Sequence, residues 1–251
     1  MTSQPPLGVI AGTGFYALAD LANPREETFS TPYGPARAIV GLLHGRSTVF
    51  LSRHGTNHSV PPHRINYRAN IQALHDLGVR DVLAVNVVGG SGHDSGDLVV
   101  VDDFLDFTRG RISTFFDGDG ASSGVVHVDV SEPYAEHLRQ AWIGASARLG
   151  IPVVPHGVYA CFEGPRFESK AEIRMAQAAG ATVVGMTGVP EVVLAVERGL
   201  SYAAICLVAN PAAGLGSVPI TIEDVNDVVA AGAAEVTQLL VAAADDLNAA
   251  G

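Results

Sequence analysis

Short apolar runs alternate along the chain with longer segments in which apolar residues recur at helical spacing. Such runs are typical of strands buried on both faces of a sheet, and such spacing is typical of helices with one face in a core. Because the two patterns alternate, and no repeat, charge run or linker interrupts them, we expect one α/β domain spanning residues 1–251. The predicted strands are residues 7–11, 38–43, 48–51, 81–88, 97–107, 156–162 and 202–209. The predicted helices are residues 67–77, 134–149, 170–179 and 220–247.

Composition narrows the classes of function. The chain carries 15 Lys and Arg against 26 Asp and Glu, and this net charge of −11 argues against nucleic-acid binding. The two cysteines, Cys161 and Cys206, are too few for a disulfide framework or a metal knuckle. The N-terminal residues lack the pattern of a signal peptide, and no apolar run is long and uninterrupted enough to span a bilayer. We therefore expect a cytoplasmic protein without membrane association.

Glycine-rich or positively charged loops follow several predicted strands. Gly12-Thr13-Gly14 can hold an anion through backbone amides, or it can be a plain tight turn. A dinucleotide-binding fingerprint, with Ala17 as its third position, is another interpretation, but the prolines that follow break the βαβ unit it needs. Arg53 and His54, together at a strand end, suit an oxyanion, or they lie in a solvated loop.

Two polar side chains stand at the ends of later strands. Asn210 ends the apolar run 202–209 and precedes a proline that cannot continue a ladder, so we expect it to contact a small ligand. Glu168 lies near a helix start, where it either faces a ligand or merely favours the helix dipole. Asp102, Asp103 and Asp106 could bind a metal, but adjacent aspartates in a loop are more often solvated. We predict no metal site.

Six motifs carry a more specific signal, and together they resemble the purine nucleoside phosphorylase family, in particular the branch that includes methylthioadenosine phosphorylase. The motifs are AGTG (11–14), RHG (53–55), INYRANIQAL (65–74), VNVVGGSG (85–92), EGPRFES (163–169) and GMTGVPEVVLA (185–195). The resemblance runs from Gly8 to about Val228. It implies a central mixed, partly barrel-like sheet flanked by helices. It also implies a pentosyltransferase that uses inorganic phosphate as co-substrate, with no cofactor.

The resemblance assigns roles to individual residues. Glu168, Asn210 and His54 are its catalytic candidates. It implies a homotrimer in which His127 of one subunit reaches the site of its neighbour, although His127 can equally be a surface residue. The phosphate would be held by Thr13, Arg53, His54, Thr187 and the backbone near Val87. The nucleoside would contact Met186, Phe162, Glu168, Asn210, Ile220, Ile222, Val225 and the neighbour's His127.

The expected base follows from the resemblance, in which the 6-oxopurine phosphorylases carry the Glu and the Asn, and hydrogen-bond chemistry explains this pairing. A Glu168 carboxylate can accept from the N1–H of a 6-oxopurine, whereas it would oppose the N1 lone pair of adenine. The Asn210 amide can donate toward N7 or O6, which an ionised Asp could not do. One misplaced buried polar contact costs roughly 1–3 kcal/mol, so two such contacts can discriminate strongly.

The expected sugar follows from the start of the last helix. Ile220, Ile222 and Val225 would form an apolar wall that suits a 5′-methylthio group, or they are simply the core-facing stripe of that helix. We expect phosphorolysis of S-methyl-5′-thioinosine, which the sequence NPAAG after the strand also favours by resemblance. Inosine or guanosine is the second expectation and methylthioadenosine the third. A nucleoside-binding protein without activity is the alternative outside the enzymes.

Overall fold

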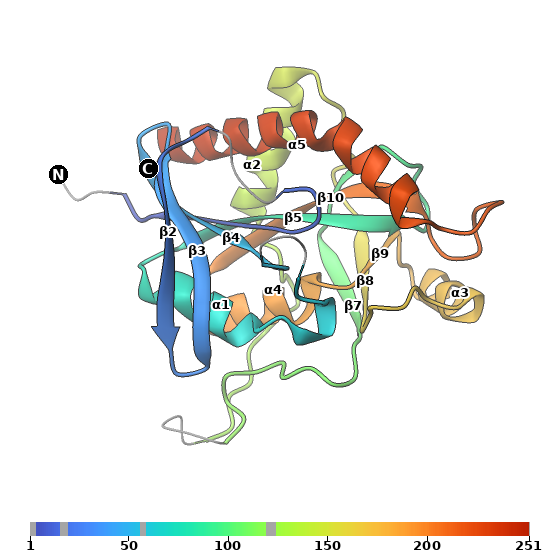
Figure 1. The fold of residues 1–251 in the computed structure, drawn as a ribbon, viewed down its shortest axis with the longest axis horizontal. Helices are drawn as coiled ribbons and strands as arrows, with labels where there is room; N and C mark the ends of the chain where they lie inside the picture. Colours follow the sequence, from blue (N-terminus) through green and yellow to red (C-terminus); the bar gives the residue numbers. More distant parts are fainter. Residues whose placement is uncertain (1–3, 16–19, 56–58, 119–123, 251) are drawn as a thin grey trace.

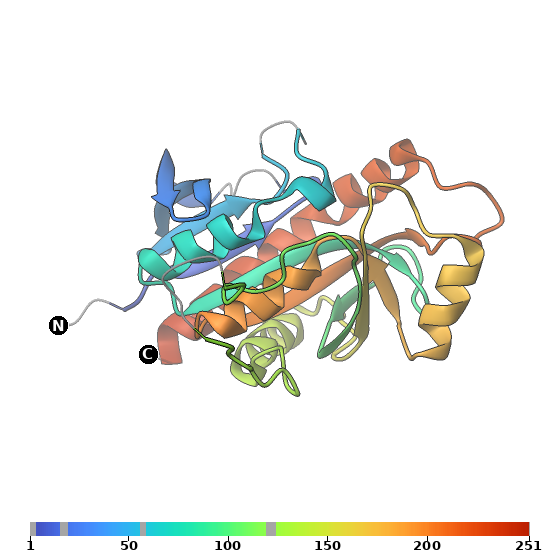
Figure 2. The same cartoon turned by 90° about the horizontal axis from the view of Figure 1, so that it is seen from below.

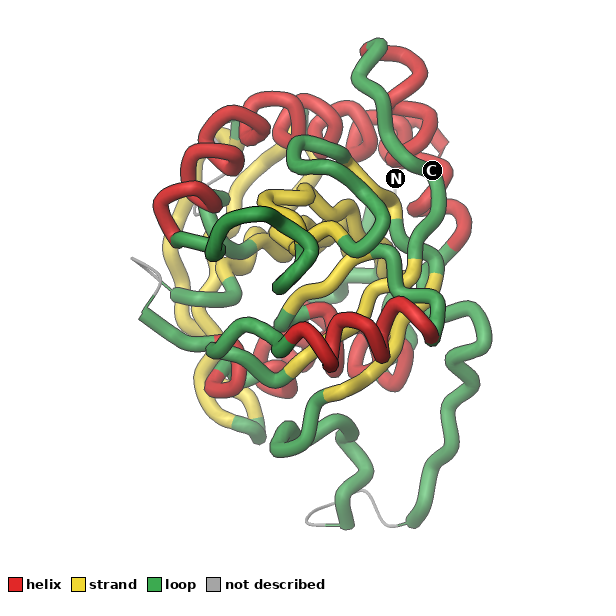
Figure 3. The backbone as a smooth tube through the Cα atoms, turned by 90° about the vertical axis from the view of Figure 1, so that its right-hand side faces the viewer, coloured by secondary structure: helices red, strands yellow, loops and turns green. Residues whose placement is uncertain are grey.

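A computed structural model describes residues 4–15, 20–55, 59–118 and 124–250. In this part of the chain ten strands form one mixed sheet, and its main path runs β2-β3-β4-β1-β5-β9-β8-β7, with β10 paired to β5 and β6. The strands are β1 (Leu7–Ala11), β2 (Leu21–Thr31), β3 (Gly34–Leu43), β4 (Arg46–Ser52), β5 (Asp81–Gly90), β6 (Leu98–Val100), β7 (Asp103–Phe107), β8 (Val158–Phe162), β9 (Val183–Gly185) and β10 (Ser201–Pro211). Figure 3 shows the curved sheet enclosed between helices. The predicted α/β fold with a central mixed sheet is confirmed.

Helices cover both faces of the sheet (Figure 1). α1 (Tyr67–Asp76) and α4 (Gly188–Glu197) lie side by side on one face, which Figure 2 shows from below. α2 (Glu136–Leu149) and α5 (Ile222–Ala250) pack together on the other face. The short α3 (Lys170–Ala178) lies at the edge, between β8 and β9 in the chain.

The central strands β5 and β10 are buried on both faces because their side chains alternate between two cores. Along β10, Tyr202, Ala204, Cys206 and Val208 join the core under α1 and α4. The intervening residues Ala203, Ile205, Leu207 and Ala209 join the core under α2 and α5. This period of two explains why both strands read as continuous apolar runs. It also leaves their carboxyl ends as the places where polar side chains can emerge.

A register shift interrupts the pairing of β10 with β5 near its end. Val208 pairs with Val88, but the next partners are Asn210 and Gly89, so Ala209 is an extra residue in β10. β10 then continues through Pro211, which pairs with Gly90. The prediction that the strand stops before Asn210 is therefore wrong, because the bulge lets the chain resume pairing beyond it.

The N-terminal hairpin is larger than predicted. The pattern predicts strands 38–43 and 48–51 and none between residues 12 and 37, whereas β2 runs through Asn23 and Pro24 and pairs with β3. The pairing shifts between Ala22 and Arg25, and Asn23 has φ 52°. Proline is tolerated there because β2 is an edge strand and the bulge removes the need for a ladder hydrogen bond.

The predicted strand 97–107 is two strands. β6 pairs antiparallel with β10, whereas β7 pairs parallel with β8, so the chain changes partners around Asp102. Asp102 marks the change, since its Oδ1 accepts a hydrogen bond from the Gly157 amide at 3.0 Å. This structural role accounts for one acidic residue of that loop. The short β9 was not predicted, because three residues are too few to show a periodicity.

α5 is, among the described residues, the helix that is long and apolar enough by composition alone to cross a membrane. Val236, Leu239 and Ala243 of this helix are fully buried in the core beneath α2 and α5. α5 contacts both α2 and β10, which is the packing expected of a core helix in a globular protein.

Candidate active site

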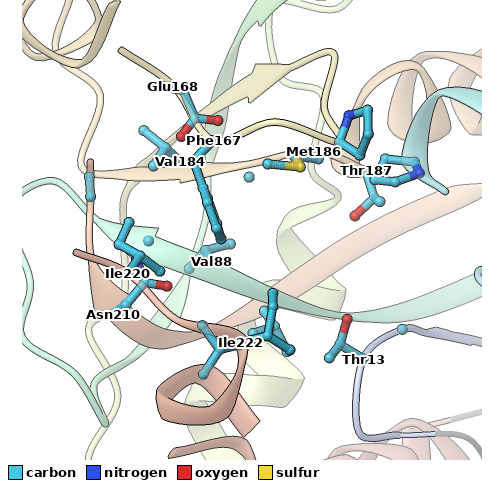
Figure 4. A pocket seen from close by; sticks show the side chains of 18 of the residues that line it. Thr13, Val88, Phe167, Glu168, Val184, Met186, Thr187, Asn210, Ile220 and Ile222 are labelled. Carbon is cyan, nitrogen blue, oxygen red and sulfur yellow. The ribbon is translucent and has the colours of Figure 1, made fainter. Parts of the chain in front are cut away.

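A cavity of about 570 Å³ opens where the carboxyl ends of β1, β4, β5 and β10 meet the start of α5. Figure 4 places Thr13 and Thr187 on one side of it, Glu168 and Asn210 on the other, and Met186 between them. The lining residues are Gly12, Thr13, Arg53, His54, Pro61, Pro62, Val87, Val88, Gly89, Pro165, Phe167, Glu168, Val184, Gly185, Met186, Thr187, Asn210, Ala212, Ala213, Ile220, Ile222, Val225 and Asn226.

Two loops meet at the Thr13 end of the cavity. The amide of Arg53 donates to the carbonyl of Ala11 at 2.9 Å, which extends the parallel pairing of β1 and β4 beyond both strands. A Cβ on Gly12 would lie 3.4 Å from the His54 ring and 3.7 Å from Nη1 of Arg53. The Gly12-Thr13 backbone therefore passes directly against Arg53 and His54. Amide, hydroxyl and guanidinium donors at one point suit a phosphate.

Arg53 is held by a fully buried carboxylate. Its Nε and Nη2 donate to the two oxygens of Glu191 at 2.7 and 2.6 Å, and its Nη1 donates to the Val85 carbonyl at 2.6 Å. Burial alone would lower the pKa of Arg53, but the charge of Glu191 and its hydrogen bonds raise it above its usual range. Two N–H groups of the guanidinium, one on each terminal nitrogen, remain for a ligand.

His54 and Thr187 are also oriented by the protein. The Nδ1 atom of His54 donates to the carbonyl of Val60 at 2.8 Å, which fixes the plane of the ring. The Thr187 hydroxyl donates to Oδ1 of Asn86 at 3.3 Å, and its amide donates to the Tyr159 hydroxyl at 3.2 Å. Asn86 therefore has a described role that is structural: it positions a cavity residue from within β5.

Met186 lies between the two ends of the cavity, where the turn after β9 meets the loop after β8. A Cβ on Gly164 would lie 2.6 Å from Sδ of Met186, and Gly164 has φ 65°, so glycine is required there on both counts. The close approach holds the Met186 side chain against the 163–168 loop. A thioether at this place offers an apolar surface to a sugar.

Glu168 and Asn210 form the opposite end. Glu168 is only 9% exposed, and its Oε1 has no hydrogen-bond partner among the described residues. Burial raises the pKa of Glu168 above its ordinary value. The Nδ2 atom of Asn210 donates to the Pro211 carbonyl at 2.7 Å, which orients the amide and leaves its second N–H for a ligand.

The position of Glu168 follows from the helix that comes after it. Ser169 is the N-cap of α3: its hydroxyl accepts from the Glu172 amide at 3.2 Å, and Oε2 of Glu172 accepts from the Ser169 amide at 2.7 Å. This capping box satisfies the helix start without Glu168. The alternative that Glu168 serves mainly to favour the helix dipole is therefore not needed.

Ile220, Ile222 and Val225 all line the cavity at the start of α5. Ile222 is 61% exposed, so it does not belong to the core-facing stripe of the helix, which was the alternative interpretation. An exposed isoleucine at a cavity wall is a surface that a bound apolar group would cover.

Two predicted ligand contacts lie outside the cavity lining. Phe162 is buried among the side chains beneath α3 and stacks on Phe107 with ring centroids 4.9 Å apart, because its position in β8 directs it away from the cavity. Phe167, five positions later and inside the motif EGPRFES, lines the cavity in its place. His127 is exposed in the segment between β7 and α2 and does not line the cavity of its own chain.

Other candidate residues are placed as follows. Within the described ranges no group of three His, Cys, Asp or Glu side chains could hold a metal ion. Ala17, the third position of the dinucleotide interpretation, lies outside the described residues. Asn226 was missed, although it follows Val225 and stands four positions after Ile222, which places it on the same helix face. Glu191 was also missed, although a single carboxylate inside an apolar helix is a signal for a buried partner.

The fold and cavity define an α/β protein with an anion-holding end and an amide-and-carboxylate end that suits a heterocycle. The chain belongs to the phosphorylase superfamily, whose family model matches residues 6–245. This confirms the resemblance found in the motifs.

Named relatives lie within the same superfamily. A probable 6-oxopurine nucleoside phosphorylase of Moorella thermoacetica is 50% identical over 225 residues, covering 89% of this chain and 86% of the relative. A probable S-methyl-5′-thioinosine phosphorylase of Methanothermobacter thermautotrophicus is 47% identical over 246 residues, covering 96% and 84%. The structure is similar to methylthioadenosine phosphorylase from Schistosoma mansoni in complex with adenine, with a TM-score of 0.93, 32% identity and coverage of 98% of this chain and 93% of that one.

Proposed function

We propose that the protein catalyses phosphorolysis of a 6-oxopurine nucleoside, with S-methyl-5′-thioinosine as its preferred substrate. The observation that carries the proposal is the pair at one end of the cavity: a buried Glu168 oxygen without a partner, and an Asn210 amide with an N–H to donate. The names of relatives at 50% and 47% identity support the same class of substrate.

The two side chains match the edge of a 6-oxopurine. Glu168 as carboxylate accepts from N1–H, and this contact supplies the partner that its Oε1 lacks within the described chain. Asn210 donates to N7 or O6. Adenine would place an N1 lone pair opposite the carboxylate, and an unpaired contact of this kind costs roughly 1–3 kcal/mol.

The other end of the cavity holds phosphate as the nucleophile. One phosphate oxygen forms a bond to the anomeric carbon, the glycosidic C–N bond breaks, and its electron pair moves into the purine. Thr13, His54 and the two remaining N–H groups of Arg53 position the anion, and Thr187 joins them when its hydroxyl turns its hydrogen from Asn86 toward a phosphate oxygen. The developing charge on the purine is stabilised by the Asn210 donor, as in other sites where donors face a growing negative charge. No cofactor is needed for this step.

The sugar lies between these ends, with Met186 on one side and the start of α5 on the other. Ile222 and Val225 give its 5′ position an apolar wall, where a methylthio group is buried favourably and where these two side chains offer a hydroxyl no hydrogen bond. We propose that the protein acts in the cytoplasm as a homotrimer and that His127 completes the 5′ end of a neighbouring site. The exposure of His127 outside its own cavity supports this arrangement.

The test is a comparison of kcat/KM for S-methyl-5′-thioinosine, S-methyl-5′-thioadenosine, inosine and guanosine, with and without phosphate. The expected order places methylthioinosine first and requires phosphate for every release of base. A higher value for inosine or guanosine would retain the base assignment and overturn the sugar assignment. A higher value for methylthioadenosine would overturn the base assignment. If no nucleoside is cleaved in a phosphate-dependent way, the assignment of the protein as an enzyme is overturned.

A further inference from the structure

Arg111 lies in a loop, and its side chain is nevertheless buried. The loop connects β7 to α2, yet only 2% of the Arg111 side chain is exposed. Its guanidinium donates to four backbone carbonyls. These belong to Val189 at 2.6 Å, Glu163 at 2.7 Å, Met186 at 2.7 Å and Phe162 at 3.2 Å.

The four carbonyls come from the two segments that form the nucleoside half of the cavity. Phe162 and Glu163 begin the loop that leads to Glu168, and Met186 and Val189 flank Thr187 in the turn that enters α4. Both segments follow the ends of strands, where carbonyls lose their ladder partners. A single side chain therefore joins the Glu168 loop to the Met186 turn.

The link runs in both directions. While Arg111 donates to the backbone of Glu163, the Glu163 carboxylate accepts from the amides of Arg109 at 2.7 Å and Gly110 at 3.2 Å. The Nε atom of Arg111 lies 3.7 Å from Oε1 of Glu163. Each loop thus binds the backbone of the other through a charged side chain, which gives strong hydrogen bonds.

The phosphate half of the cavity is held chiefly by contacts outside this link, although Thr187 lies in the turn that Arg111 binds. Arg53 is fixed by Glu191 and the Val85 carbonyl, and Thr13 follows β1. Thr187 has its own contacts with Tyr159 and Asn86. A change at Arg111 should therefore move the groups that contact the nucleoside more than those that contact phosphate.

We propose that Arg111 is a positioning residue for nucleoside binding, which fixes the Glu168 loop and the Met186 turn relative to each other. This inference rests on the proposed function. Lysine cannot replace the arginine, because an ammonium has three donors on one atom and cannot span four carbonyls as a planar fork does. Without these hydrogen bonds the two segments would no longer be held together and could move apart. A displacement of about 1 Å can reduce catalysis roughly 100-fold.

The experiment measures KM for the nucleoside, KM for phosphate and kcat in the wild type, R111K and R198K. Arg198 is the matched control, because its contacts lie away from the cavity. Its Cζ atom lies 3.9 Å from the ring centroid of Phe115, which belongs to the same loop as Arg111, and its Nη2 donates to the Tyr33 hydroxyl at 3.2 Å. For R111K we expect a rise in nucleoside KM of roughly 10-fold or more and a change in phosphate KM of less than about 3-fold. R198K should resemble the wild type in all three constants.

Three outcomes decide the matter. An active wild type with an unchanged nucleoside KM in R111K would overturn the positioning role, as would an equal rise in both KM values. An R198K enzyme with the same split as R111K would also overturn it. A wild type without turnover would instead contradict the proposed function, so the two failures are distinguishable.

A second variant keeps the test decisive if R111K does not fold. E163A removes the reciprocal contacts to Arg109 and Gly110 from a side chain that is 31% exposed, so the chain should tolerate it. We expect the same split with a smaller rise, roughly 3- to 10-fold in nucleoside KM. An unchanged nucleoside KM in folded E163A would overturn the proposal.

Discussion

Arg53 and Glu191 form a two-point ion pair between residues 138 positions apart, and both side chains are 1% exposed. The Tyr202 hydroxyl donates to the same carboxylate at 2.7 Å, so strand β10 supports the pair from below. The residue that follows β4 thus supplies the cation, α4 supplies the anion, and β10 supplies a hydroxyl that binds the same carboxylate. This arrangement gives an arginine that lines the cavity the rigidity of a core residue.

The first prediction concerns the stability that this pair contributes. E191Q should lower the free energy of unfolding by about 3–5 kcal/mol, because it leaves the buried Arg53 charge without a counterion. Denaturant unfolding measures the change. E27Q is the control, since the Arg25–Glu27 contact at 3.7 Å is exposed and should be worth less than about 1 kcal/mol. Equal effects of the two substitutions would refute the assignment.

A second prediction concerns the base. N210D should reduce kcat/KM for methylthioinosine roughly 10- to 100-fold and raise the relative activity on methylthioadenosine, since an ionised carboxylate cannot donate to N7 or O6. N226D places the same new charge elsewhere on the lining and should leave the ratio between the two nucleosides unchanged. An unaltered ratio in N210D would remove Asn210 from base recognition.

A third prediction concerns pH and activity. Burial raises the pKa of Glu168, and its carboxylate accepts from N1–H more strongly than its neutral acid does, because the charge assists the bond. The kcat/KM for a 6-oxopurine nucleoside should therefore fall as pH drops through that raised pKa, at a pH above the ordinary glutamate value of about 4.3. E168Q should lack this acidic limb as well as most of the activity. An identical pH profile in the two enzymes would exclude Glu168 as the titrating group.

The same raised pKa has a consequence for stability, with a definite sign. A carboxyl whose pKa is higher in the folded than in the unfolded state holds its proton more tightly when folded. Its contribution to stability is complete below the unfolded pKa and is lost as pH rises through the folded pKa. The free energies of unfolding of E168Q and the wild type should be measured at about pH 4 and about pH 7. The stability of E168Q relative to the wild type should be greater at the higher pH.

A fourth prediction concerns the 5′ group of the sugar. I222H should shift the ratio of kcat/KM from methylthioinosine toward inosine by roughly 10-fold, because an imidazole can bond a 5′-hydroxyl that Ile222 leaves unpaired. V218H is the control, since Val218 is 71% exposed but does not line the cavity. If the ratio stays at its wild-type value in I222H, the wall is not made by this residue.

Much of the fold could be predicted because the buried strands are visible in the sequence as continuous apolar runs. β5 and β10 are apolar on both faces, and the amphipathic helices end at glycines such as Gly78, Gly150 and Gly180. β2 was not predicted, because its bulge lets the strand continue through Asn-Pro. Whether a proline breaks a strand depends on whether that strand lies at the edge of its sheet. That information belongs to the assembled sheet and is absent from the local sequence.

The candidate site divides in a similar way. Residues that touch the cavity, such as Thr13, Glu168 and Asn210, stand in motifs at strand ends and could be named in advance. Residues that act through others could not, because Arg111 and Glu191 find their partners only after distant segments have come together. Phe162 was misassigned for another reason: it directly precedes the motif EGPRFES, but its place on β8 directs the ring into the core.

The extra residue in β10 gives the base contact an unexpected origin. Side chains of a strand alternate between faces, so if Ala209 were paired in a regular ladder Asn210 would share the face of Val208, toward α1 and α4. The insertion instead sets it beside Gly89, whose missing side chain leaves it room, and next to Ile220 near the start of α5 (Figure 4). Recognition of the base therefore depends on how β10 pairs with β5 as well as on the type of residue at position 210. A regular ladder at Ala209, which does not line the cavity, would turn the amide away from the base although no cavity residue had changed.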